Sequence, residues 1–239
     1  MPTMIGVRVL IVSGDIQTID TLCDSMAQMA MNVEVCSDIA SAAGKLCHSK
    51  FEGVIVDLTN RTEALDLLKK QREMTAYKSA VAIAVLNNSD EMPSAFRAGA
   101  SFVLARPLSS SVLMRTLRAS YPLMVRERRR SFRYPLQIPI YVSAASRAEF
   151  MATSANISEG GMALTNTTGL QVGERVALRL TVPGLEETAT IDAEICWSDN
   201  AGRVGMEFVQ VPRPVKEQLV AWLADRLGES LLEEAALKL

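Results

Sequence analysis

The first half of the chain contains five short apolar runs that show no alternation of polar and apolar residues. Segments with helical periodicity, at residues 16–30, 40–48 and 63–73, separate the runs. Strands that are apolar on both faces and are separated by helices are typical of a parallel sheet with helices on both sides. We therefore predict an α/β doubly wound five-stranded sheet, with any site at the carboxyl ends of its strands. The five runs are residues 7–12, 33–35, 54–56, 80–86 and 101–105.

The second half has a different pattern, in which short strands alternate with turn residues such as Pro183-Gly184. Even spacing of short strands favours a small closed antiparallel β-barrel. A C-terminal helix is expected from Pro214 to about Leu227, packed over the barrel. The acidic, amphipathic residues 229–239 are interpreted as an ordinary terminal helix or a frayed end rather than a partner motif. The expected strands are residues 138–142, 148–154, 161–165, 175–182, 187–197 and 203–209.

A length of 239 residues allows two domains, and a hydrophobic content of 49% is enough for two cores. We expect domains at residues 1–120 and 134–228, a linker at 121–133 and a tail at 229–239. Residues 112–121 have one apolar helical face, and Pro122 should end or kink that helix.

Composition excludes several classes of function. The formal net charge is −2, so an arginine-rich segment is a local feature and bulk attraction to nucleic acid is disfavoured. The four cysteines have no CxxC spacing, which argues against structural zinc and disulfides. No apolar run approaches the ~20 residues of a membrane span, and no signal peptide is visible. We therefore expect a cytoplasmic protein.

Two polar motifs lie near the start of the second half. Arg128, Arg129 and Arg133 belong to the first, and Asn156-Ile157-Ser158-Glu159-Gly160-Gly161 forms the second. Guanidinium groups bind phosphate oxygens and the O6/N7 edge of guanine bidentately. Asn and Ser add short hydrogen-bonding side chains, and the Gly pair permits close approach of the backbone. A solvated basic surface is the alternative for the arginines taken alone.

Together the motifs resemble the signatures of the PilZ domain family, RxxxR and [D/N]xSxxG, over about residues 124–226. The resemblance implies binding of the bacterial second messenger cyclic di-GMP. It also implies a set of binding residues, whereas Trp197 is interpreted as a core residue in preference to a stacking surface. The implied binding residues are Arg128, Arg129, Arg133, Asn156, Ser158, Gly160 and Gly161.

The first half resembles the receiver domain of response regulators, because Asp57 ends the third strand and Arg106-Pro107 ends the fifth. A working receiver has two acids after its first strand to hold Mg²⁺, and Ser13-Gly14 stand there, followed by Asp15. Arg106 also replaces the family's lysine, and Asn87 its Thr or Ser. We therefore expect no metal site, a vestigial phosphoacceptor at Asp57, and a remaining role in protein contact such as homodimerisation.

Catalysis finds little support, because the chain has a single His and no HExxH, GxSxG or phosphate-binding fingerprint. We predict a non-enzymatic cyclic di-GMP receptor or adaptor that changes its conformation and its binding of an unidentified protein target. The family resemblance implies control of motility, biofilm or polysaccharide. One alternative is a phosphorylation-dependent response regulator that uses Asp57, with the barrel as effector. Another is a scaffold that no longer binds ligand.

Overall fold

The computed structural model describes residues 6–29, 31–74, 77, 79–145, 147–167, 169–182 and 188–236. From residue 230 onward it describes only the backbone. The chain divides into two compact units between Arg128 and Arg129, and each unit is described by itself. Among the described residues, no helix is long and apolar enough to cross a membrane.

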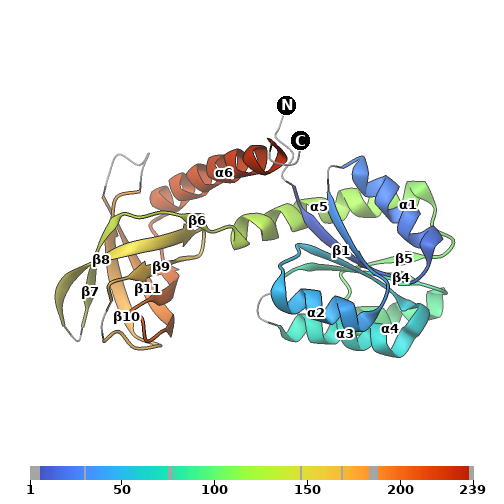
Figure 1. Cartoon of the computed structure of the whole chain (residues 1–239), viewed down its shortest axis with the longest axis horizontal. Coiled ribbons are helices and arrows are strands. Elements are labelled where there is room, and N and C mark those ends of the chain that lie inside the picture. Colours follow the sequence, from blue (N-terminus) through green and yellow to red (C-terminus); the bar gives the residue numbers. More distant parts are fainter. Residues whose placement is uncertain are drawn as a thin grey trace. The chain divides into compact units, whose positions relative to one another are not determined.

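The first unit contains a five-stranded parallel sheet in the order β2-β1-β3-β4-β5, as the unbroken apolar runs predict (Figure 1). The side chains of β3 and β4 are buried throughout, because helices cover both faces of the sheet. The chain reverses its direction of travel across the sheet between β1 and β3, where α/β proteins place their sites. The strands are β1 (Arg8–Val12), β2 (Asn32–Cys36), β3 (Gly53–Asp57), β4 (Val81–Leu86) and β5 (Phe102–Ala105).

The helices of this unit form two layers, with α1 and α5 on one face of the sheet and α2, α3 and α4 on the other (Figure 1). Asp15 and Asp38 begin α1 and α2, where their carboxylates accept the backbone N–H groups of Thr18 and Ser41. The helices are α1 (Ile16–Ala27), α2 (Ile39–His48), α3 (Arg61–Glu73), α4 (Met92–Arg97) and α5 (Ser110–Ser131), with short 3₁₀ turns η1 (Leu58–Asn60) and η3 (Ser89–Glu91).

Helix α5 continues through Pro122, so the helix does not end at that residue. A proline inside a helix costs about 3 kcal/mol, since it removes one backbone hydrogen bond. Leu113, Leu117 and Met124 lie on the helix face opposite Pro122, and all three are fully buried. Each such side chain contributes roughly 1.5–3 kcal/mol, so their combined burial outweighs the loss. Pro122 itself is exposed, so it takes no place in the buried face of the helix.

The second unit is a closed antiparallel barrel with strand order β6-β8-β7-β10-β11-β12-β9 and an additional β8–β9 pairing, which agrees with the predicted fold (Figure 1). Every second side chain of β10, and of β11 as far as Ile195, is buried, the alternation expected of strands with one face toward a core. The strands are β6 (Tyr134–Pro135), β7 (Pro139–Ala144), β8 (Arg147–Ser158), β9 (Gly161–Thr165), β10 (Arg175–Leu180), β11 (Ala189–Ser198) and β12 (Val204–Gln210).

Helix α6 (Arg213–Ala236) does not stop at Gly228, where the sequence suggested that a separate tail begins. A glycine inside a helix costs only about 1 kcal/mol. Leu219, Leu223 and Leu227 are buried along α6, so one glycine does not end it. Trp222 packs edge-on against Tyr134 of β6 with ring centroids 5.3 Å apart, which ties the helix to the barrel. Residues 237–239 of the expected tail lie outside the described residues.

Candidate functional site

A pocket of about 350 Å³ opens on the second unit, where the end of α5 meets β8, β9, β11 and β12. Its volume falls in the range of small-ligand sites. The sequence motifs meet here, because β8 brings Asn156 opposite Ala163 and Ser158 opposite Gly161 of β9. The lining residues are Arg130, Arg133, Asn156, Ser158, Gly160, Met162, Ala163, Cys196, Trp197, Gly205, Met206 and Glu207.

Ser158 connects the two predicted motifs directly. Its hydroxyl accepts a hydrogen bond from Nη1 of Arg133 at 3.3 Å and donates to the carbonyl of Gly161 at 2.9 Å. Ser158 is 2% exposed, so its position is fixed by packing as well as by these bonds. The serine therefore orients Arg133, whose exposed guanidinium reaches into the pocket.

Asn156 offers the pocket an acceptor. Its Oδ1 atom is buried and has no hydrogen-bond partner among the described residues. A buried polar atom without a partner costs about 1–3 kcal/mol, which a ligand donor would recover. The register of β8 against β9 shifts between Ser154 and Asn156, a bulge of the kind that redirects a side chain at a site.

Glycines form the floor of the pocket because side chains there would collide with the opposite strand. A Cβ atom on Gly161 would lie 2.1 Å from the carbonyl oxygen of Met206, and one on Gly205 would lie 1.9 Å from Nε1 of Trp197. Gly160 has open space around its missing Cβ atom. Gly161 is therefore required by packing, whereas Gly160 leaves the rim of the pocket open.

Trp197 is 46% exposed and lies over Gly205 at the pocket wall, so its assignment to the core is wrong. The cause is a register shift of β11 against β12 between Ile195 and Trp197. Ile195 stays in the core, and the extra residue turns Trp197 outward. An exposed indole beside two arginines is a surface on which a base can stack.

The structure does not bring all the predicted arginines together. Arg130 lines the pocket with Arg133, although the sequence motif did not single it out. Arg129 lies instead in a separate small hollow beside Phe132, Glu159 and helix α6. Because α5 ends at Ser131, the helical spacing rule does not extend from Arg129 to Arg133. Arg130 could be identified as a pocket residue from the sequence only if the end of α5 at Ser131 were known.

Arg128 belongs to the first unit. Its Nη1 atom lies 3.6 Å from Oε1 of Glu52, which is fully buried and accepts the backbone N–H of Arg8 at 2.8 Å through Oε2. Burial raises the pKa of Glu52, an effect that the bond from Arg8 and the charge of Arg128 oppose. The preceding residue is held as well, since Glu127 pairs with Lys50 at 3.0 Å.

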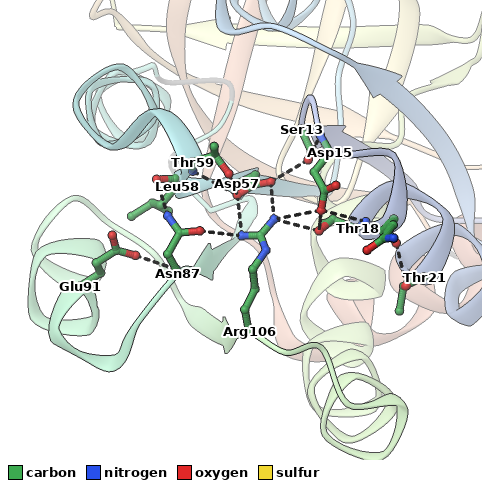
Figure 2. A network of polar contacts seen from close by, with 11 residues as sticks. Ser13, Asp15, Thr18, Thr21, Asp57, Leu58, Thr59, Asn87, Glu91 and Arg106 are labelled. Atoms are coloured by element: carbon green, nitrogen blue, oxygen red, sulfur yellow. Dashed lines mark hydrogen bonds and ion pairs between the residues drawn. The ribbon is translucent and has the colours of Figure 1, made fainter.

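A second polar cluster surrounds Asp57 at the end of β3 in the first unit (Figure 2). Arg106 binds its carboxylate bidentately, with Nη1–Oδ1 at 2.9 Å and Nη2–Oδ2 at 2.7 Å. Ser13 donates to Oδ2 at 2.7 Å, and Thr59 donates to Oδ1 through its N–H and its hydroxyl. Burial alone would raise the pKa of Asp57, but the bonds from Arg106, Ser13 and Thr59 together lower it.

The Arg106 guanidinium fills the space in front of Asp57, where it also reaches Thr18, Asn87 and Asp15 at 2.8, 3.1 and 3.5 Å. The described residues contain no group of three His, Cys, Asp or Glu side chains that could hold a metal ion. The Mg²⁺ that a receiver fold implies does not fit this donor set, in which a cation already occupies the carboxylate.

The barrel, the paired motifs and the pocket define a ligand-binding module attached to an α/β unit. The PilZ domain family model matches residues 127–225, and these residues form a PilZ domain. The match covers the pocket and all of its lining residues. A comparison with curated proteins finds no match.

Among solved structures, the first unit is similar in fold to response-regulator receiver domains. A response regulator from Thermotoga maritima is 18% identical with a TM-score of 0.45, and the alignment covers 49% of this chain and 98% of that one. The chemotaxis response regulator CheY4 of Vibrio cholerae is 20% identical with a TM-score of 0.45, and the alignment covers 48% and 98%. The receiver-like assignment rests on the strand order β2-β1-β3-β4-β5 of the unit itself.

Proposed function

We propose that this protein is a cyclic di-GMP-binding signalling receptor or adaptor whose ligand occupies the pocket of the PilZ domain. The observation that carries the proposal is the convergence of Arg133, Asn156 and Ser158 on one pocket, with Arg130 and Trp197 beside them. A ligand with two guanines and two phosphates matches arginines, an aromatic face and short polar side chains.

The pocket residues would take separate roles. Arg130 and Arg133 bind phosphates and the O6/N7 edges of guanine, while Trp197 stacks on a base. The buried Oδ1 atom of Asn156 accepts a hydrogen bond from a ribose hydroxyl or a guanine N–H group. Ser158 holds Arg133 in place, and the open space at Gly160 lets the ligand approach the backbone.

Arg128 and Arg129 complete the proposed ligand set when the ligand is bound. Arg128 must leave its ion pair with Glu52 to do so, and Arg129 must leave the hollow beside α6. Ligand binding would thereby change the contacts made by the end of α5, which is the proposed origin of a conformational signal. The output would be altered binding of a protein target, in control of motility, biofilm or polysaccharide, in the cytoplasm. Dimerisation through the receiver-like unit remains part of the proposal.

Phosphorylation at Asp57 is the alternative input. Both oxygens of that carboxylate are held by Arg106, and an attacking oxygen must first be released from its guanidinium. Among the described residues, Asp15 is the further acid that contacts the same guanidinium, at 3.5 Å. The contacts of Asp57 therefore favour ligand binding over phosphorylation as the signal to which the protein responds.

Calorimetry of the full chain with cyclic di-GMP tests the proposal. Arg133→Ala should nearly abolish binding, because loss of a charged contact that the bound ligand would bury costs about 2–5 kcal/mol. Asn156→Ala should weaken binding less, by about 1–3 kcal/mol. Arg179→Ala is a matched control, since Arg179 lies on the same barrel, pairs with Glu149 and lies outside the pocket. Wild-type affinity in Arg133→Ala, or equal binding of GTP, would refute the proposed site.

A further inference from the structure

Glu207 is the one acidic residue among those that line the pocket. It lies on β12 directly opposite Gly161 of β9, and it is exposed, whereas its neighbour Met206 is buried in the core. Side chains alternate between the two faces of a strand, so Glu207 shares the outward face of Gly205, the glycine beneath Trp197. The carboxylate therefore stands next to the stacking surface.

The surroundings of Glu207 make a carboxylate unfavourable there on structural grounds alone. On its other side Glu207 faces Glu194 of β11, and like charges directly opposite one another destabilise a strand pair. Glu194 is paired with Arg175 at 3.3 Å. Within the described part of the chain, Glu207 makes no ion pair, even though Arg130 and Arg133 line the same pocket. Fold stability therefore does not explain this acid.

The chemistry of guanine does explain it. One edge of the base carries the acceptors O6 and N7, which arginines bind, and the other carries the donors N1–H and the 2-amino group. A carboxylate accepts two parallel N–H bonds, as it does from arginine. Outward positions on one strand are separated by about 6.8 Å, so a base that lies on the indole at Gly205 extends as far as residue 207.

We propose that Glu207 selects guanine by accepting hydrogen bonds from N1–H and the 2-amino group of one base of the ligand. This inference rests on the proposed function and assigns the residue that would read the base. Adenine presents an unprotonated N1 and no 2-amino group to the same carboxylate, so the acid would repel it. Hypoxanthine keeps O6, N7 and N1–H but lacks the 2-amino group, and should lose part of the interaction.

Calorimetry of the full chain with cyclic di-GMP and with its cyclic di-inosine analogue tests the assignment. A hydrogen bond to a charged group contributes about 1.5–3 kcal/mol, so wild type should prefer the guanine ligand by about ten- to hundredfold. Glu207→Gln should weaken cyclic di-GMP binding by at least about tenfold and reduce that preference, because the amide replaces one acceptor with a donor.

Glu194→Gln is the control, because it removes the charge directly across the strand pair while leaving Glu207 in place. It should retain the wild-type preference for guanine. If Glu207 only repelled the phosphates, Glu207→Gln would tighten both ligands equally, and that result would overturn the assignment. An unchanged ratio in Glu207→Gln would overturn it as well. In both cases Arg133-dependent binding would persist, whereas a wild-type protein that binds neither ligand would refute the proposed function too.

Discussion

Arg128, a member of the arginine motif, is paired with Glu52, a fully buried carboxylate immediately before β3, with Nη1 and Oε1 3.6 Å apart. Only 19% of the Arg128 side chain is exposed. The arginine that would act as a third ligand contact is thus retained by the receiver-like unit. If the ligand requires Arg128, part of its binding energy must be used to separate this ion pair.

Glu52→Gln should therefore tighten cyclic di-GMP binding. The amide keeps an oxygen that can accept the N–H of Arg8 but removes the charge that holds Arg128. We expect a gain of about tenfold, corresponding to about 1.4 kcal/mol. Titration calorimetry measures the change, and thermal unfolding checks that the variant is folded.

A double-mutant cycle separates competition from a general effect of the substitution. In an Arg128→Ala background, Glu52→Gln should no longer alter the affinity, because the competing partner is absent. Glu34→Gln serves as the control, since Glu34 pairs with Arg8 and Lys45 in the same unit and does not contact the motif. Equal tightening in both backgrounds would show that Glu52 does not act through Arg128, and would overturn the proposed competition.

Acetyl phosphate with Mg²⁺ should leave the intact mass of the protein unchanged. Phosphoryl transfer needs a metal to neutralise charge at the acceptor, and Arg106 occupies both oxygens of Asp57 instead. The variant Ser13→Asp/Gly14→Asp/Arg106→Lys restores the missing acids and should bind Mg²⁺ measurably. A phosphoryl adduct on wild type that disappears in Asp57→Asn would establish the phosphorylation-dependent alternative.

Much of the fold follows from local pattern. The unbroken apolar runs became a parallel sheet because both of its faces are covered, and the Asn156 and Ser158 motif reached the pocket because β8 and β9 are neighbours in sequence. Helix α5 was not predictable in the same way. Its passage through Pro122 depends on burial of Leu117 and Met124 against a sheet that the sequence pattern does not place.

The predictions for Trp197, Arg128 and Arg130 were wrong or incomplete because each position depends on a feature that the local sequence pattern does not show. Trp197 turns outward at a bulge, and a bulge breaks the alternation from which burial is inferred. Arg128 pairs with Glu52, 76 positions earlier in the chain, and no local pattern predicts such a pair. Arg130 enters the pocket because the helix ends after it.

The first unit should lose stability in acid partly through Asp57. Its pKa is lowered below the ordinary value of 3.8 in the folded chain. The stabilisation is therefore complete above pH 3.8 and is lost as the pH falls from there through the folded pKa. Ser13→Ala removes the 2.7 Å bond to Oδ2, so it should raise the pKa and move the acid transition to higher pH. Hydrogen exchange of the β3 amides, followed from about pH 2.5 to about pH 5, measures the shift. Identical profiles for wild type and Ser13→Ala would contradict the assignment.

Trp197 should report ligand binding through its fluorescence. The chain contains two tryptophans: Trp197 is exposed at the pocket, while Trp222 lies on α6 against Tyr134. A base that stacks on the indole should quench it, so cyclic di-GMP should lower the emission of wild type and of Trp222→Phe. Trp197→Phe should lose this response while binding remains measurable by calorimetry, because phenylalanine still offers a ring.

Trp197→Ala should weaken binding by about 1–3 kcal/mol, the usual cost of losing one base–aromatic stack. Quenching that survives in Trp197→Phe and vanishes in Trp222→Phe would place the ligand at α6 instead of the glycine floor.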